Sequence, residues 1–147
     1  MTGSSAIDAE RAFARASRGR RRAALARRLR RAPADKGRLC VYGEPRAPRS
    51  GAVGRGGVRE IPITAISGTL EPSRAAMFDR CFRPAARARS RWERLWLAEH
   101  HGAVLPPISV IQVGDRYAVR DGHHRVSVAK ARGALSIDAS VDAVDLP

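Results

Sequence analysis

The pattern that most restricts the fold of this chain lies in its C-terminal half. Ile108 to Val113 is a β-branched, nearly uncharged run, and in Arg116 to Arg120 the larger apolar residues Tyr117 and Val119 stand at alternate positions, as in a strand. Gly114-Asp115 lies between the two runs, with glycine first as a type II′ turn requires. His123 to Ala131 then has helical spacing, and Gly133 is placed to end that helix. The pattern predicts a β-hairpin whose second strand leads directly into a helix.

The turn between that strand and that helix is Asp121-Gly122-His123-His124-Arg125. The first N–H groups of a helix have no partner inside it and lie at the positive end of its dipole, so such a turn attracts anions. Arg125 adds a forked cation that suits phosphate. Gly122 favours a turn with positive φ, and Asp121 could hold a metal ion or cap the helix. The turn predicts a phosphate site.

The other expected elements are two strands and two helices, at Val58 to Ile66, 73–82, 84–101 and Ser136 to Val141. Pro62 marks an edge or an end of the first strand. Ser73 is placed to act as the N-cap of the first helix. Trp92 and Trp96 recur on the apolar face of the second helix, so they are expected to pack in the core. This order predicts an α+β domain with a mixed sheet over residues 58–147.

The net charge of +14 is concentrated in the first 59 residues, which contain 16 Lys and Arg against four Asp and Glu. Residues 8–32 lack proline and are rich in Ala, Arg and Leu, so a helix is expected there. Its arginines repeat at spacings of three and four and repel one another. Phe13, Leu25 and Leu29 are its sizeable apolar residues. The segment is either a solvated or disordered tail or an arm for nucleic acid, whose phosphates would neutralise it.

The arm is assigned to residues 1–32, and residues 33–57, rich in Pro, Gly and Arg, are assigned as a linker. Within that linker, Leu39 to Tyr42 could add an edge strand. Of the 28 basic residues 26 are arginine, which suits phosphate, although a GC-rich coding sequence would give the same bias. The arm is expected to bind DNA rather than RNA, and its candidate contacts are Arg20, Arg21, Arg22, Arg27, Arg28, Arg30 and Arg31.

Composition also excludes several classes of protein. Cys40 and Cys81 have no C-x-x-C partner, which argues against a zinc ribbon or a disulfide scaffold and fits a reducing compartment. The four histidines form two adjacent pairs, which do not place two ligands on one helix face, so no metal site is expected. No apolar run approaches the roughly 18 residues of a membrane span. We therefore expect a cytoplasmic protein, with association with the nucleoid as one outcome of DNA binding.

Several segments together resemble the ParB/sulfiredoxin-like domain superfamily. Its members pair a PI-V strand and a Y-V-DG strand with a G-x-x-R turn and an Ala-rich helix. The matching residues are Pro106-Pro107-Ile108, Tyr117-Ala118-Val119, Asp121 to Arg125, Ala129 and Gly133. The resemblance covers residues 58–144 and is strongest over 105–141. It implies a nucleotide or phosphate pocket at the turn, with Gly122, His124 and Arg125 as binding residues.

Members of that superfamily differ at the turn. Sulfiredoxins have Gly-Cys-His-Arg there, and His123 replaces the nucleophilic cysteine, so sulfiredoxin activity is not expected. Chromosome-partitioning ParB proteins have Gly-Glu-Arg-Arg, followed by a second nucleotide box and a helix-turn-helix that do not occur before Pro147, so their CTP-gated clamping is not expected either. The Asp-Gly-His-x-Arg form resembles ParB-like serine kinases, which use an adenine nucleotide to phosphorylate a small hydroxyl substrate.

The turn and the resemblance together predict a site for a nucleotide, either CTP or ATP/ADP, with Mg²⁺ as an additional candidate. The basic arm is predicted to bind DNA. One alternative is a small phosphotransferase or nucleoside triphosphate hydrolase. In that case Asp121 and His123 would be catalytic, and Glu60 or Glu71 would supply the carboxylate that phosphoryl transfer needs. The other alternative is a binding module of the same fold without catalysis.

Overall fold

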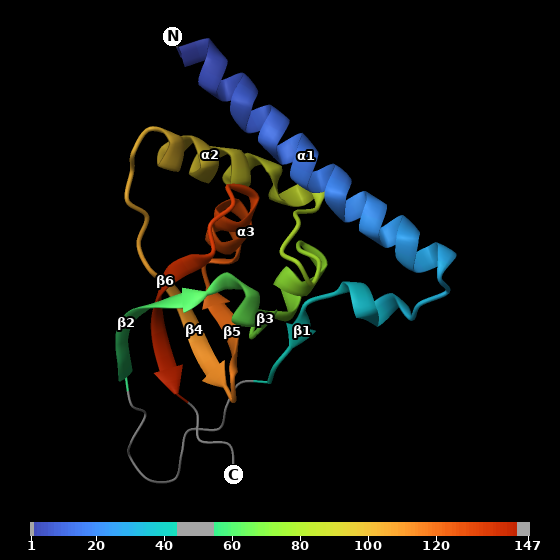
Figure 1. The fold of residues 1–147 in the computed structure, drawn as a ribbon, viewed down its shortest axis with the longest axis vertical. Coiled ribbons are helices and arrows are strands. Elements are labelled where there is room, and N and C mark those ends of the chain that lie inside the picture. Colours follow the sequence, from blue (N-terminus) through green and yellow to red (C-terminus); the bar gives the residue numbers. More distant parts are fainter. Residues whose placement is uncertain (1, 44–54, 144–147) are drawn as a thin grey trace.

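A computed structural model describes residues 2–43 and 55–143 of the chain. The strands in this part are β1 (Cys40–Val41), β2 (Arg55–Pro62), β3 (Ile66–Thr69), β4 (Ile108–Val113), β5 (Arg116–Asp121) and β6 (Ser136–Ala143). The α-helices in the same part are α1 (Thr2–Leu29), α2 (Arg89–His100) and α3 (His123–Ala131). The strands form one sheet in the order β1-β3-β5-β4-β6-β2. In Figure 1, α3 lies between the sheet and α2, and α1 crosses the outer side of α2.

The predicted hairpin and the helix after it are confirmed. Strands β4 and β5 pair antiparallel, with Val110 opposite Val119, and Gly114 in the turn has a φ of +61°. Helix α3 begins at His123, three residues after Arg120, as the pattern predicts. Strand β5 is also parallel to β3, and β4 is parallel to β6, so the sheet is mixed. The α+β class is therefore confirmed as well.

The expected single strand from Val58 to Ile66 is wrong, because the chain turns at Pro62. Strand β2 ends at this residue, which has a fixed φ and no N–H to donate to a ladder. A short 3₁₀ turn, Ile63–Ala65, follows before β3 begins. The two strands then take distant places in the sheet, since β2 pairs with β6 whereas β3 pairs with β1 and β5.

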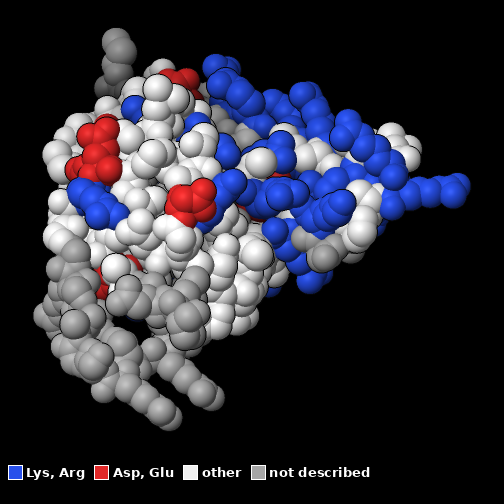
Figure 2. Space-filling view, turned by 60° about the horizontal axis from the view of Figure 1, so that its bottom comes forward, with Lys and Arg blue, Asp and Glu red and all other residues white. Residues whose placement is uncertain are grey.

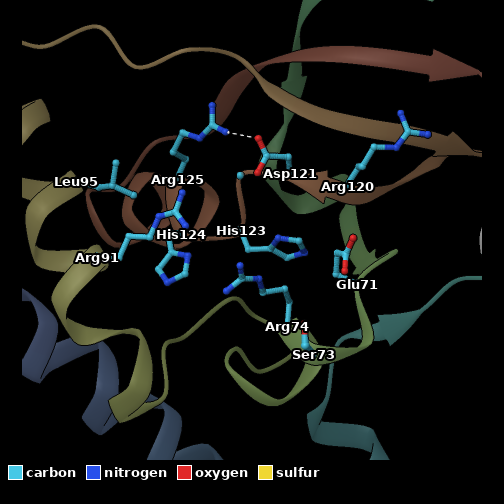
Figure 3. A pocket seen from close by; sticks show the side chains of 11 residues that line it. Glu71, Ser73, Arg74, Arg91, Leu95, Arg120, Asp121, His123, His124 and Arg125 are labelled. Carbon is cyan, nitrogen blue, oxygen red and sulfur yellow. Dashed lines mark hydrogen bonds and ion pairs between the residues drawn. The ribbon is translucent and has the colours of Figure 1, made fainter.

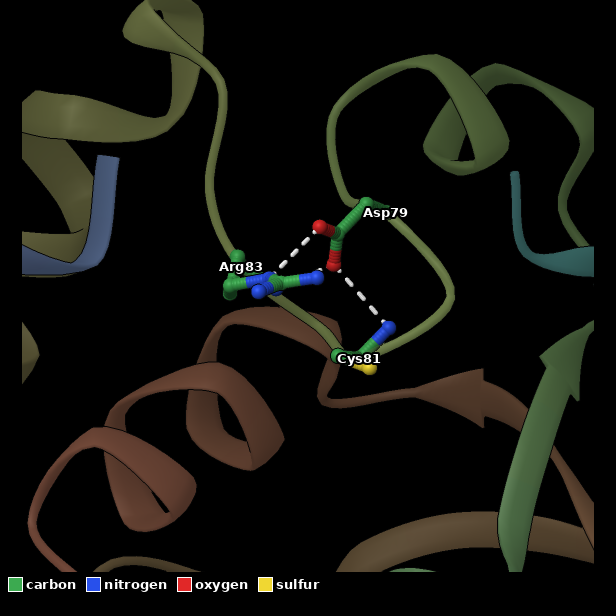
Figure 4. Close-up of polar contacts among 3 residues, drawn as sticks. All are labelled: Asp79, Cys81 and Arg83. Carbon is green, nitrogen blue, oxygen red and sulfur yellow. Dashed lines mark hydrogen bonds and ion pairs between the residues drawn. The ribbon is translucent and has the colours of Figure 1, made fainter. Parts of the chain in front are cut away.

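The helix expected over 73–82 is also wrong, and Ser73 is not its N-cap. A 3₁₀ turn at Pro72–Ala76 takes its place, and no side chain caps it. Beyond it the chain folds back around Asp79, whose Oδ1 accepts the backbone N–H groups of Cys81 and Arg83 at 2.9 Å each. Oδ2 of the same carboxylate accepts Arg83 Nε at 2.7 Å (Figure 4). A buried carboxylate with three donors therefore fixes a turn where helical spacing alone would continue a helix.

The second predicted helix starts later than Pro84. A 3₁₀ turn at Ala86–Ala88 precedes α2, which begins at Arg89. Its tryptophans pack as expected: Trp92 is fully buried and donates its Nε1–H to Ser127 Oγ at 2.9 Å, and Trp96 is half-buried. This hydrogen bond joins α2 to α3 on the side of α3 that faces away from the sheet.

Helix α1 starts at Thr2 and ends at Leu29, rather than spanning 8–32, and it packs on the domain. Phe13 is 6% exposed and meets Trp92 edge to face, with ring centroids 5.5 Å apart. Leu25 and Leu29, the other sizeable apolar residues of the helix, are 57% and 77% exposed. The contact with α2 is thus made by the first half of α1, and its Arg-rich second half extends beyond it.

The predicted edge strand in the linker is confirmed. Cys40 and Val41 form β1, which pairs parallel with β3 at one edge of the sheet. The rest of the predicted linker includes residues 44–54, which lie outside the described residues. Within the described ranges, no helix combines the length and the apolar composition needed to cross a membrane.

Candidate functional site

A cavity of about 300 Å³ opens where β5 passes into α3. Three segments that are distant in sequence contribute its walls (Figure 3). They are the loop after β3, with Glu71, Ser73 and Arg74; helix α2, with Arg91 and Leu95; and the turn 120–125. The structure therefore brings all five predicted residues of the turn to one cavity.

Gly122 makes the turn possible. Its φ is +110°, a conformation that side chains with a β-carbon rarely adopt. A β-carbon placed on it would lie 2.5 Å from Ile108 Cγ2, on the neighbouring strand β4. The residue is thus required both by the backbone conformation and by the close approach of β4, and it sets where α3 begins.

No side chain caps the N-terminus of α3. The first helical hydrogen bond there is donated by the N–H of Val126 to the carbonyl of Gly122, so the N–H groups of the preceding residues come before the helical ladder. Asp121 does not serve as a cap: its carboxylate, 73% exposed, instead accepts Arg125 Nη2 at 3.0 Å. The helix start therefore keeps donors for an acceptor from outside the helix.

Arg125 is held mainly by the protein. Its Nη1 donates to the carbonyls of Pro106 and Pro107, at 2.6 and 3.0 Å, and its Nη2 donates to Asp121. The side chain is only 14% exposed. A guanidinium has five N–H donors, so these three bonds leave Nε–H and one Nη2–H for a ligand. The main role of Arg125 is thus to hold the segment before β4, and its two remaining N–H groups can donate to a bound phosphate.

His123 is buried and neutral. Burial, then the positive charges of Arg74 and His124, lower its pKa from 6.5 to about 4, against an opposing effect of Asp121. Its Nε2 is hydrogen-bonded to Thr69 Oγ1 at 2.6 Å, and its ring stacks on Phe78. These contacts fix the ring at the back of the cavity.

His124 has a similar environment. It is buried against the edge of Phe78, with ring centroids 5.1 Å apart. Burial first, and then Arg91 and Arg74, lower its pKa from 6.5 to about 4. At neutral pH neither histidine contributes a positive charge, so the charge of the cavity comes from its arginines and carboxylates.

Four arginines and two carboxylates line the cavity. Two of the arginines are paired: Arg120 with Asp142 of β6 at 2.8 Å, and Arg125 with Asp121. Arg74 and Arg91 form no ion pair with any carboxylate in the described part of the chain, although Arg74 Nη1 lies 3.2 Å from Met77 Sδ. The cavity therefore carries an excess of positive charge beside the start of α3.

Arg74 and Arg91 were missed by sequence reasoning. Arg91 is exposed and stands at the rim of the cavity. Arg91 and Leu95 are four residues apart and so share a face of α2. That spacing is the only signal in the sequence, and it does not reveal that this face lies next to α3.

Of the two carboxylates considered for phosphoryl transfer, Glu71 lines the cavity and Glu60 does not. Glu60 lies on β2, at the far edge of the sheet, where it accepts a hydrogen bond from Ser136 Oγ. Glu71 lies in the same cavity as His123 (Figure 3). In residues 2–43 and 55–143, no group of three or more His, Cys, Asp or Glu side chains is placed to hold a metal ion.

Five of the seven arginines assigned to nucleic acid are exposed, namely Arg21, Arg22, Arg28, Arg30 and Arg31. The other two are half-buried. Arg20 has a buried Nε without a hydrogen-bond partner in the described residues, and the guanidinium of Arg27 packs against Gly37. Figure 2 shows Lys and Arg gathered on one side of the molecule, with Asp and Glu more frequent on the other.

Searches of protein-family models and of curated proteins found no match to this sequence. A search of solved structures found a sulfiredoxin from Arabidopsis thaliana, which is 22% identical, with a TM-score of 0.39. The match covers 57% of this chain and 82% of the sulfiredoxin chain. What the cavity can bind follows from its own side chains.

Proposed function

We propose that the cavity at the start of α3 binds the phosphates of a nucleotide, either CTP or ATP/ADP. One observation carries the proposal: Arg74 and Arg91, which lack carboxylate partners among the described residues, face the uncapped N-terminus of α3 across a cavity whose two histidines are neutral. An anion there gains backbone hydrogen bonds, the field of the helix and two forked cations together.

The size of the cavity supports phosphates rather than a whole nucleotide inside it. At about 300 Å³ it is at the lower end of the range of roughly 300–1,000 Å³ that ligand pockets occupy. The base and the ribose would therefore extend beyond the rim, past Arg91 and Leu95. Mg²⁺, if it takes part, would arrive with the nucleotide and use its phosphate oxygens.

Ligand-induced stabilisation tests the proposal. Thermal unfolding is measured with CTP, ATP, ADP and inorganic phosphate, each with and without Mg²⁺, for the natural chain and for Arg91→Ala. A bound nucleotide should raise the melting temperature, and Arg91→Ala should remove most of the rise. Arg94→Ala is the matched control, since Arg94 is exposed on the same helix and does not line the cavity. No shift with any nucleotide, or an equal shift in both variants, would contradict the proposal.

Phosphotransfer is a second candidate function, favoured by the position of Glu71 in the same cavity as His123. Glu71 would orient or deprotonate an acceptor hydroxyl, and the arginines would neutralise the phosphates. Release or transfer of phosphate from ATP or CTP is measured with and without serine. Glu71→Gln should abolish turnover and preserve nucleotide-induced stabilisation. If no turnover occurs while nucleotides still stabilise the protein, the chain acts as a binding module.

The exposed arginines in the second half of α1 support a further part of the proposal, that this half binds DNA. Deleting the helix is not a clean test, because Phe13 packs on Trp92. The double variant Arg21→Gln/Arg28→Gln is better suited, since both side chains are exposed. It should weaken DNA binding. It should also reduce the slope of the logarithm of the binding constant against the logarithm of the salt concentration, by the share of about two phosphate contacts. Unchanged affinity and salt dependence would refute a role for α1.

A further inference from the structure

A second, larger hollow of about 820 Å³ lies at the β1 edge of the sheet. Five basic residues from four segments surround it, and no acidic residue lines it among the side chains that the structure describes. We call it the basic groove, defined by Lys36, Arg38, Arg80, Arg116 and Lys130. All five are exposed, and none lies within ion-pair distance of a carboxylate among the side chains that the structure describes. We propose that the basic groove binds single-stranded nucleic acid.

The charge of the groove is built by the fold rather than by one run of sequence. Lys36 and Arg38 come from the segment before β1, Arg116 from the start of β5, and Lys130 from the last turn of α3. Arg80 is held in place, because its backbone N–H donates to the carbonyl of Gly37 and its Nη1 donates to the carbonyl of Lys36. Five cations held around one concave surface suit a chain of phosphates, since each neutralised phosphate releases counterions.

The floor of the groove favours a single strand over a duplex. Its apolar lining comes from Leu39, Ile63 and Ile66, which are buried, and from Val41, which is 47% exposed. A single strand can bring unpaired bases against the exposed side chain of Val41 while its phosphates contact the basic rim. A duplex keeps its bases inside and would use the rim alone.

The groove adjoins the basic half of α1. The guanidinium of Arg27 packs against Gly37, between Lys36 and Arg38, so the last turns of the helix lie beside the groove. The inference therefore goes beyond the proposed DNA binding by α1, because it names different residues and stands on the lining of the groove alone. It does not depend on the nucleotide cavity, which shares no lining residue with the groove in the described part of the chain.

Fluorescence anisotropy with a labelled 15-residue oligothymidylate, measured on the full chain over a range of salt, tests the inference. Lys36→Glu/Arg116→Glu should raise the Kd at least about tenfold, because it replaces two phosphate contacts by repulsion. Arg87→Glu/Arg94→Glu is the control with the same change in net charge. Both of its residues are exposed and lie outside the groove. Thermal unfolding verifies that each variant folds.

The outcomes separate the groove from α1. If the groove variant binds no worse than the control while Arg21→Gln/Arg28→Gln binds weakly, the groove inference is wrong and the proposal for α1 stands. The reverse result supports the groove and refutes α1. If an unlabelled duplex of the same length displaces the oligothymidylate as well as the unlabelled single strand does, the preference for a single strand is wrong.

A measurement without any charge substitution uses Cys40, which is exposed and lines the groove. Its alkylation by N-ethylmaleimide is followed by mass spectrometry, with and without saturating oligothymidylate. A strand bound in the groove should slow the reaction at Cys40. An unchanged rate at saturation would overturn the inference even if the charge variants weaken binding.

Discussion

Gly122 is the residue on which the geometry of the turn depends most directly. We predict that Gly122→Ala lowers the free energy of unfolding by about 2–4 kcal/mol, since it adds both an unfavourable φ of +110° and a clash with Ile108. Urea unfolding gives the value. Gly102→Ala is the matched control: its φ is +86°, but nothing lies within 4 Å of the added β-carbon. It should cost only about 1 kcal/mol, and equal costs at the two positions would argue against the close approach of β4.

Arg125 and Arg91 are expected to differ in what their loss affects. Arg125→Ala removes two hydrogen bonds to the Pro106 and Pro107 carbonyls, so it should lower the free energy of unfolding by about 2 kcal/mol without any ligand. Its ion pair with Asp121, whose carboxylate is largely exposed, should add little. Arg91→Ala should leave stability within about 0.5 kcal/mol and weaken phosphate binding. Urea unfolding and ligand titration separate the two effects, and a destabilising Arg91→Ala would contradict this division.

At the scale of elements, α1 is expected to unfold together with the sheet domain. Phe13→Ala should lower the free energy of unfolding by about 3 kcal/mol, because it empties the contact with Trp92. Leu25→Ala, on the same helix but 57% exposed, should change it by less than about 0.5 kcal/mol. Far-ultraviolet circular dichroism should show one transition in the natural chain. A separate early loss of helix would show that α1 is independent of the domain.

The elements that the sequence predicted well are those fixed by neighbouring residues. The β4–β5 hairpin depends on β-branched runs around Gly114-Asp115, and α3 depends on its own spacing and on Gly122, so both follow from local pattern. The helix expected over 73–82 was wrong because the Asp79 carboxylate gathers donors from residues that follow it, which helical spacing does not reveal.

In the candidate site, too, the residues within one local stretch of sequence were predictable, and those from distant segments were not. Gly122, His124 and Arg125 come from one continuous turn, and all three line the cavity. Arg74 and Arg91 come from other segments. The loop after β3 brings Arg74 to the cavity, and the packing of α2 on α3 brings Arg91 there. The contact of Phe13 with Trp92 was missed for the same reason, since the two residues are distant in sequence and each pattern shows only an apolar position.

For the whole molecule, part of the excess positive charge lies at two concave surfaces. Arg74 and Arg91 lie at the small cavity beside α3, and the basic groove lies next to the end of α1. Over residues 2–43 and 55–143 their linings share no residue, so small phosphates and a nucleic acid strand would compete little for contacts. Salt should therefore weaken the binding of nucleic acid in the groove more than the binding of phosphate in the cavity. Exposed cations are screened by salt, whereas the buried start of α3 is screened less.

The stability of the whole molecule should fall in mild acid because of His123 and His124. Both have a pKa of about 4 in the folded protein, against 6.5 for an ordinary histidine. As the pH falls below 6.5 the unfolded chain binds these protons first, so the free energy of unfolding decreases until the folded protein is protonated near pH 4. Each histidine should remove about 1–2 kcal/mol by pH 5. Urea unfolding at pH 7.5, 6 and 5 measures the decrease.

Variants and an anion show where this pH dependence comes from. His124→Leu should reduce the slope, and His100→Gln, which changes an exposed histidine at the end of α2, should leave it unchanged. An equal slope in His124→Leu would contradict the assignment. A dianion in the cavity favours imidazolium and so raises both pKa values. Sulfate, which keeps its double charge over this pH range, should therefore stabilise the protein more at pH 5 than at pH 7.5, and Arg91→Ala should lose that difference if the anion binds beside α3.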